Sequence, residues 1–203
     1  MSVTIKEAAA QILTQAADLL SEKCAQGGAG SRMVIVAIDG RCGSGKSTLG
    51  EYLKESAGVQ LIHMDDYYLR PEQRTEKRYQ TPGENVDHER FKEEVLEPLD
   101  KGTSGLYRPY RFHEKRFLES CEVKPEGIIV IEGSYSHHPE LSGYYDVKVF
   151  LDESKETQEA RIRKRGGDAV WEMFRDRWIP LEELYFDACR VREQAGIVLV
   201  VQE

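Results

Sequence analysis

Apolar positions near the start of the chain recur at alternating spacings of four and three residues. The positions are Ile5, Ala9, Ile12, Ala16 and Leu19. This spacing lines one face of a helix, because an α-helix completes a turn about every 3.6 residues. The glycine-rich stretch that follows favours the end of that helix. We therefore expect an N-terminal helix within residues 1–30.

Five short apolar runs follow, and each is rich in β-branched or aliphatic residues. They occupy residues 33–38, 59–63, 128–131, 147–151 and 197–201. Continuous runs of this length are typical of strands that are covered on both faces, as in parallel sheets. Helical patterns separate the runs at about 46–56, 88–100, 154–165 and 168–193, with Pro180 as a candidate break in the last. The alternation predicts an α/β fold with three layers, helix, sheet and helix.

The segment from residue 70 to 124 differs from the rest of the chain. It contains four prolines, many charges and several aromatic residues, with one helical pattern and no strongly buried strand. Segments this long without a buried strand are usually functional when they occur inside a compact domain. We interpret residues 70–124 as an insertion that encloses a small molecule over the open edge of the sheet, within a single domain formed by residues 1–203.

Composition narrows the class of protein. The chain has 203 residues, of which 40% are hydrophobic and 32% charged, and its formal net charge is −8. No apolar run approaches the roughly 18 residues of a membrane span, and the acidic balance argues against general nucleic-acid binding. The four cysteines lie far apart without a C-x-x-C pair, which is typical of reduced thiols. We therefore expect a cytoplasmic protein that binds neither membranes nor nucleic acids.

A phosphate-binding motif directly follows the first predicted strand. The loop consists of Gly40, Arg41, Cys42, Gly43, Ser44, Gly45, Lys46, Ser47 and Thr48, which is the pattern G-x-x-x-x-G-K-S. Its glycines let successive backbone N–H groups point toward one anion, and the next helix directs its positive dipole end there. Lys46 can reach the β- and γ-phosphates of ATP, and the Ser47 hydroxyl can bind Mg²⁺. The motif predicts nucleoside triphosphate binding, with Cys42 as a candidate low-pKa thiol at a helix N-terminus.

Carboxylates follow two other predicted strands. Glu132 ends the run at 128–131 and can hold Mg²⁺, and Gly133 after it leaves space for the metal and the phosphates. Asp65 and Asp66 follow the run at 59–63. Because the carboxyl ends of parallel strands share one edge, Asp65 should face the same crevice as the phosphate loop and accept a proton from a hydroxyl. We interpret Asp66 as a turn residue.

These motifs together resemble the uridine kinase-like group, which includes nicotinamide riboside kinases, phosphoribulokinase and the P-loop pantothenate kinases. The resemblance rests on the phosphate loop, Asp65 to Tyr68, Asn85-Val-Asp87-His88, and Glu132-Gly133. It extends from Val34 to about Val201. It implies a five-stranded parallel sheet in the order 2-3-1-4-5 and ATP-dependent phosphorylation of a small hydroxyl compound.

The resemblance also implies roles for individual residues. Asp65 corresponds to the catalytic base of the family. Asp87 corresponds to a carboxylate that holds the ribose hydroxyls of a nucleoside. Tyr68, Tyr110 and Phe112 belong with the residues that contact the acceptor.

Residues 154–178 resemble the arginine-bearing lid of the same family. Arg161 and Arg165 are four positions apart and share a helix face, whereas Arg163 points elsewhere. Arginines on a closing lid can stabilise the charge that spreads over the transferred phosphoryl group. Arg161 and Arg165 therefore join Lys46 and Asp65 as the predicted catalytic residues.

The sequence leaves alternatives open. The favoured acceptor is a nucleoside of the uridine or cytidine type, phosphorylated at its 5′-hydroxyl, and the alternatives are nicotinamide riboside, pantothenate or a sugar phosphate. A nucleoside monophosphate kinase also stays open, because several arginines can bind an acceptor phosphate; they are Arg70, Arg74, Arg78, Arg108 and Arg111. A P-loop ATPase that switches a partner protein is the rival from another class. A homo-oligomer is compatible with the sequence, and we interpret His137 and His138 as loop residues rather than metal ligands.

Overall fold

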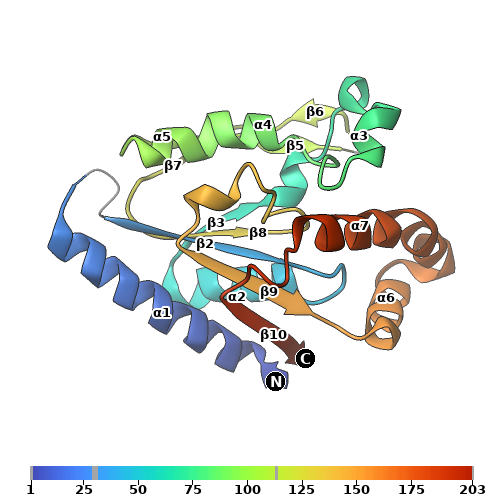
Figure 1. Cartoon of the computed structure of the whole chain (residues 1–203), viewed down its shortest axis with the longest axis horizontal. Helices are drawn as coiled ribbons and strands as arrows, with labels where there is room; N and C mark the ends of the chain where they lie inside the picture. The colour runs from blue at the N-terminus through green and yellow to red at the C-terminus, as the bar shows by residue number, and fades with distance from the viewer. Residues whose placement is uncertain (1, 29–31, 113, 203) are drawn as a thin grey trace.

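The computed structural model describes residues 2–28, 32–112 and 114–202, and its centre is a six-stranded parallel sheet (Figure 1). From edge to edge the strands are β1 (Ser2–Thr4), β10 (Ile197–Gln202), β9 (Val147–Asp152), β2 (Met33–Gly40), β8 (Gly127–Glu132) and β3 (Gln60–His63). All five predicted strands are present, in the order 2-3-1-4-5. The strand count is wrong by one, because β1 adds a parallel edge strand beside β10. It has three residues and no apolar run, so the pattern did not reveal it.

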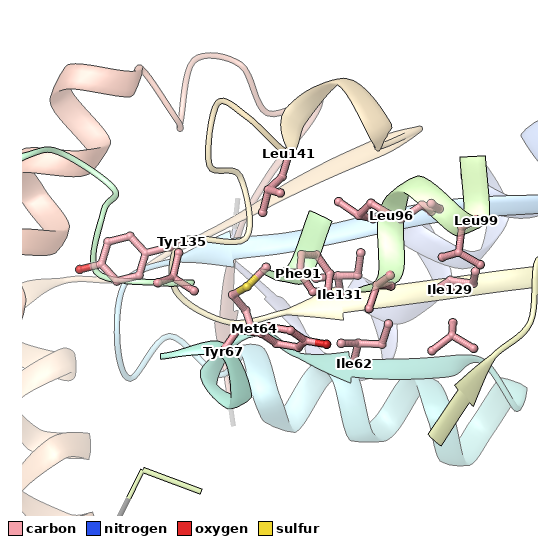
Figure 2. Packing of buried hydrophobic residues seen from close by; sticks show 14 of the residues in the cluster. Ile62, Met64, Tyr67, Phe91, Leu96, Leu99, Ile129, Ile131, Tyr135 and Leu141 are labelled. Atoms are coloured by element: carbon pink, nitrogen blue, oxygen red, sulfur yellow. The ribbon is translucent and has the colours of Figure 1, made fainter. Parts of the chain in front are cut away.

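Helices cover both faces of the sheet. One face packs against α1 (Ile5–Gln26) and α2 (Lys46–Ala57). The other face packs against a nearly continuous helical rod and against the last helix. The rod consists of α4 (His88–Phe91), the π-helical turn η3 (Lys92–Leu96) and α5 (Glu97–Asp100), and the last helix is α7 (Ile179–Cys189). Figure 2 shows Phe91, Leu96 and Leu99 of the rod packed over Ile129 and Ile131 of β8. Three layers result, as the alternation predicted.

The first helix has well-formed ends. Thr4 caps it, because its hydroxyl accepts from the Glu7 N–H while the Glu7 carboxylate accepts from the Thr4 N–H at 2.8 Å. Gly27, with φ 70°, ends it. The helix thus fills most of the predicted segment 1–30, whose residues 1, 29 and 30 lie outside the described residues. No helix in the described part of the chain combines the length and the apolar character that crossing a bilayer demands.

The insertion is more structured than the sequence predicted. Besides the rod it contains the 3₁₀ turn η2 (Pro71–Gln73), α3 (Glu76–Gln80), and two antiparallel ribbons formed by β4 (Gly105–Tyr107) with β7 (Cys121–Val123) and by β5 (Tyr110–Arg111) with β6 (Arg116–Phe117). These strands have two or three residues, of which at most one in each strand is buried. They therefore lack the apolar runs by which strands were predicted. Two further 3₁₀ turns follow sheet strands, η1 (Met64–Tyr67) and η4 (Ser142–Tyr144).

The two predicted helices near the C-terminus form one longer helical stretch. It consists of α6 (Lys155–Met173), the π-helical turn η5 (Phe174–Trp178) and α7. Gly167, with φ 75°, kinks α6 at the predicted boundary between 165 and 168. Pro180 does not break the stretch; it lies in the first turn of α7, directly after the π-helical turn η5. The helix ends at Cys189 rather than at 193, because Arg190 adopts a left-handed conformation.

Candidate active site

A cavity of about 730 Å³ lies at the carboxyl ends of β2, β8 and β3. Its wall comes from the phosphate loop, from η1 and the residues after it, from the insertion, and from α6 through α7. Figure 1 shows α6 and α7 beyond this end of the sheet. Sites for small molecules commonly measure roughly 300–1,000 Å³ and occur at this edge of α/β sheets. The cavity is the candidate active site.

The phosphate loop has the predicted geometry. A Cβ atom at Gly40, whose φ is 134°, would come within 2.1 Å of the Leu151 carbonyl oxygen, so this position requires glycine. Gly45 has φ 96° and begins α2. The Lys46 ammonium donates to the Gly40 and Arg41 carbonyl oxygens at 2.6 and 2.9 Å, which holds it over the loop. Residues 42–48 line the cavity, whereas Arg41 points away and pairs with Asp152 at 2.9 Å and with Glu183.

Hard oxygen ligands for Mg²⁺ meet beside this loop. The Ser47 hydroxyl donates to Glu132 Oε2 at 3.1 Å, and Glu132 is 1% exposed. The other Glu132 oxygen lies 2.5 Å from His63 Nδ1, and this hydrogen bond raises the pKa of His63. A hydroxyl and a carboxylate are ligands that Mg²⁺ prefers, and His63 orients the carboxylate from behind. The donor set suits a magnesium ion; Ser47 lines the cavity, whereas Glu132 lies behind it and is not part of the cavity wall.

Asp65 faces the cavity from η1. Its side chain is exposed to the cavity, and partial desolvation by the surrounding protein, with the Glu132 charge, raises its pKa. Tyr68 also lines the cavity and hydrogen-bonds Asp65. A Cβ atom at Gly133 would lie 3.1 Å from Asp65 Oδ1, so glycine there lets the carboxylate approach the end of β8. Asp66 points away from the cavity and accepts from the Tyr107 hydroxyl.

Helix α6 places cationic side chains at the cavity wall beside the phosphate loop. Arg161, Lys164 and Arg165 line the cavity, because spacings of three and four residues put them on one helix face. Arg161 donates to the Gly43 carbonyl oxygen at 3.0 Å and so touches the phosphate loop directly. Arg163 points outward and pairs with Glu159 at 2.8 Å, as the spacing predicted.

Helix α7 is fixed to the phosphate loop by a buried carboxylate. Glu182 is 3% exposed and accepts from the Cys42 N–H and from the Ser134 hydroxyl, both at 3.0 Å. Burial raises the pKa of Glu182. One turn further on, the Tyr185 hydroxyl donates to the buried Asp39 at 2.8 Å. Burial, with the Glu182 charge, also raises the pKa of the Cys42 thiol, so the hypothesis of a low-pKa cysteine is wrong.

The structure brings only some of the predicted acceptor residues to the cavity. Tyr68 and Phe112 line it, whereas Asp87 and Tyr110 do not. Asp87 caps α4 by accepting from the Arg90 N–H at 3.3 Å, and its other oxygen lies 3.4 Å from Arg90 Nε. Tyr110 is 4% exposed and packs edge-on against Phe117. Asp87 is therefore the N-cap of α4 in the structure, and its binding of ribose stays a prediction.

A sequence model of the phosphoribulokinase / uridine kinase family matches residues 35–166, which is more than half of the chain. The chain belongs to this family. None of the curated proteins compared with it is similar enough to count as a match. Family membership makes the protein a P-loop kinase that acts on a small substrate, as the motifs had indicated.

Solved structures share the fold of this kinase. A possible uridine kinase from Bacillus stearothermophilus is 19% identical with a TM-score of 0.64, over 93% of this chain and 99% of that one. A candidate fructose transport system kinase from Silicibacter sp. TM1040 is 22% identical with a TM-score of 0.63, over 98% of both chains. D-glycerate 3-kinase from Cryptococcus neoformans is 18% identical with a TM-score of 0.56, over 90% of this chain and 88% of that one. At these identities the likeness establishes the fold.

Sequence reasoning missed several residues that line the kinase cavity. Lys164 was detectable, because it lies three positions after Arg161 on the predicted helix. Glu182 gave no local signal, because its partner Cys42 lies 140 residues earlier. Tyr79 and Trp178 add aromatic surface to the wall and lie on segments whose positions depend on tertiary packing.

A second polar cluster lies apart from the cavity, where Glu84, His88 and His138 place possible ligand atoms within 4.8 Å of one another. The two imidazole rings stack at 3.9 Å, and burial, with the neighbouring His88, lowers the pKa of His138 to about 3. Arg78 already contacts Glu84 Oε2 at 3.1 Å. Because this guanidinium compensates the carboxylate, we interpret the cluster as a packing element. His138 is thus a loop residue as predicted, but a buried one.

Proposed function

We propose that the protein transfers the γ-phosphoryl group of ATP to a hydroxyl group of a small acceptor enclosed in the cavity. The single observation that carries the proposal is the shared cavity, which Asp65 and the phosphate loop both line. A hydroxyl placed between them lies next to a base and to the bound triphosphate. Family membership supports ATP as the phosphate donor.

The residues divide the reaction between them. Asp65 accepts the proton of the acceptor hydroxyl as its oxygen bonds to the γ-phosphorus, and the bond to the bridging oxygen breaks to release ADP. Its raised pKa suits proton acceptance, because a carboxylate of higher pKa is the stronger base. Lys46, Arg161 and Arg165 supply positive charge around the transferred group. Mg²⁺ held by Ser47 and Glu132 would neutralise phosphate charge.

A nucleoside is the acceptor that the sequence favours. Phe112 and Tyr79 support it, because aromatic rings on the cavity wall suit a flat base. Asp87 does not, because its carboxylate is engaged with Arg90 and lies outside the cavity.

The test is ADP release by the full chain with ATP and Mg²⁺, measured with and without acceptors. Uridine, cytidine, nicotinamide riboside, pantothenate, ribose and D-glycerate form the panel. Asp65→Asn should lower acceptor-dependent turnover by roughly a hundred- to ten-thousandfold and leave ATP affinity unchanged. Asp66→Asn is the matched control and should retain turnover, because Asp66 points away from the cavity. Hydrolysis that is equally fast without any acceptor would favour the ATPase that switches a partner.

A further inference from the structure

The insertion contains seven arginines, and one of them differs from the others in its surroundings. Arg70, Arg78, Arg90, Arg108, Arg111 and Arg116 each lie within 4 Å of a carboxylate oxygen. Among the described residues, Arg74 has no carboxylate partner. It is also the insertion arginine that lines the active-site cavity. Its charge therefore stands uncompensated at the wall that faces the acceptor.

Arg74 is held in a fixed orientation. Its Nε donates to the Leu69 carbonyl oxygen at 3.0 Å, and its guanidinium carbon lies 4.0 Å above the Phe112 ring. Stacking and this hydrogen bond immobilise the planar group, while neither uses the two terminal nitrogens. A guanidinium presented in this way binds two oxygens of a carboxylate or a phosphate at once.

The position of Arg74 relative to Asp65 fits the acceptor side. Leu69, which anchors Arg74, also lines the cavity and follows Asp65 by four residues. Four residues span at most about 14 Å, so a small acceptor can reach both groups. The cations near the triphosphate come from the phosphate loop and from α6, which are separate elements. Arg74 is therefore placed to bind the acceptor rather than ATP.

We propose that the acceptor carries a carboxylate or phosphate group and that Arg74 binds it while Asp65 faces the reacting hydroxyl. The inference rests on the proposed kinase function. It disfavours a neutral nucleoside, because such an acceptor would leave the charge of the partly buried Arg74 without a partner. Phe112 then has a structural reason to line the cavity, since it supports the guanidinium.

Matched pairs of acceptors test the chemistry. D-glycerate is compared with glycerol, ribose 5-phosphate with ribose, and uridine monophosphate with uridine, by acceptor-dependent ADP release. We expect a lower KM for an anionic member than for its neutral partner, and the pairs separate a carboxylate from a phosphate. A preference for the neutral member in every pair that reacts would overturn the inference and leave the kinase function standing.

Variants test the residue. Arg74→Ala should raise the KM of the preferred anionic acceptor roughly ten- to hundredfold, leave the KM of ATP within twofold, and abolish the preference over the neutral partner. Arg74→Lys should recover part of the loss, because it restores the charge without the planar pair of donors. Arg116→Ala is the control, because Arg116 lies in the same insertion, is exposed, and pairs with Glu114. An unchanged acceptor KM, or an equal rise for ATP, would overturn the assignment.

Binding gives a readout that does not depend on turnover. Calorimetry on the full chain, saturated with Mg²⁺ and a non-hydrolysable ATP analogue, measures D-glycerate and ribose 5-phosphate directly. Binding that Arg74→Ala weakens at least tenfold supports the anion site even if no phosphoryl transfer is found, which would then count against the proposed function alone. Binding that Arg74→Ala leaves unchanged, or no binding of either anion, would overturn the inference.

Discussion

Gly133 offers a test of how closely Asp65 must be positioned. It follows β8 with φ 137°, a conformation that residues with a side chain rarely adopt. A Cβ atom there would lie 2.9 Å from the Met64 Cβ and 3.1 Å from Asp65 Oδ1. Gly133→Ala therefore presses on the first turn of η1, which carries the proposed base.

The contacts set the size of the effect. Nonbonded carbon atoms prefer roughly 3.5–4.0 Å, so Met64 and Asp65 must move by about 0.5–1 Å. A displacement of about 1 Å in a catalytic group costs about a hundredfold in rate. Backbone strain and overpacking each add about 1–3 kcal/mol, so the free energy of unfolding should fall by roughly 2–6 kcal/mol. Many domains of ordinary stability stay folded after such a loss.

The assay compares kcat, the KM of ATP, and urea denaturation for two alanine variants. Gly127→Ala is the control, because Gly127 begins the same strand with φ 70°, but a Cβ atom added there would meet no other atom within 4 Å. It should lose about 1 kcal/mol of stability and keep its kcat. Gly133→Ala should lose about a hundredfold in kcat with an unchanged KM for ATP. A kcat within threefold of the wild type would refute the argument that crowding displaces Asp65.

Three other predictions concern the phosphate loop, Asp87 and His138. Lys46→Ala and Ser47→Ala should each lower kcat/KM for ATP about a hundredfold or more, because each removes a group that stabilises phosphate charge. Steady-state ADP release measures this loss, and near wild-type rates would contradict the ATP site. Asp87→Asn should lower the unfolding free energy by about 1–3 kcal/mol while acceptor KM stays unchanged, because Asp87 caps α4 and neutralises the buried Arg90; a raised KM would restore its predicted role in ribose binding. The pKa of His138 is lowered to about 3, below the ordinary value of about 6.5. Between pH 7 and 5 the unfolded chain therefore gains a proton at His138 that the folded chain does not gain. The free energy of unfolding should fall by about 2 kcal/mol over that range. Urea denaturation at both pH values should show a smaller loss in His138→Gln, and an equal loss would contradict this account.

The sequence predicted the five strands that carry apolar runs, the edge strand β3 included, and missed the strands of two or three residues. All eight residues of β2 are buried, and the apolar character of residues 33–38 follows from that environment. Ser2–Thr4 and the ribbon strands of the insertion are short, and each contains at most one buried residue, so their surroundings demand no run of apolar side chains. Their pairing depends on partners far along the chain, such as Val200 for Ser2.

The candidate site likewise contains residues whose positions could be predicted from the sequence and residues whose positions could not. The phosphate loop and Asp65 were predictable, because each follows a strand and the parallel sheet brings these ends together. The position of Asp87 was not, because its proximity to Arg90 and Arg70 depends on how the insertion folds back. Arg74 was one of five arginines with equal standing in the sequence, and the structure distinguishes it by its place at the cavity wall and by the carboxylates beside the other four.

The phosphate loop is held by partners from β8, β9, α6 and α7, such as Glu132, Asp152 and Glu182, whereas the opposite wall of the cavity belongs to the insertion. On the proposed roles, the two halves of the reaction are built by separate parts of the chain. If Arg74 binds the acceptor as proposed, substitutions in the insertion should alter which molecule is phosphorylated while the phosphate loop keeps its contacts. Such modularity makes the scaffold easy to diversify, and an engineer who wants a new acceptor can randomise the insertion wall alone.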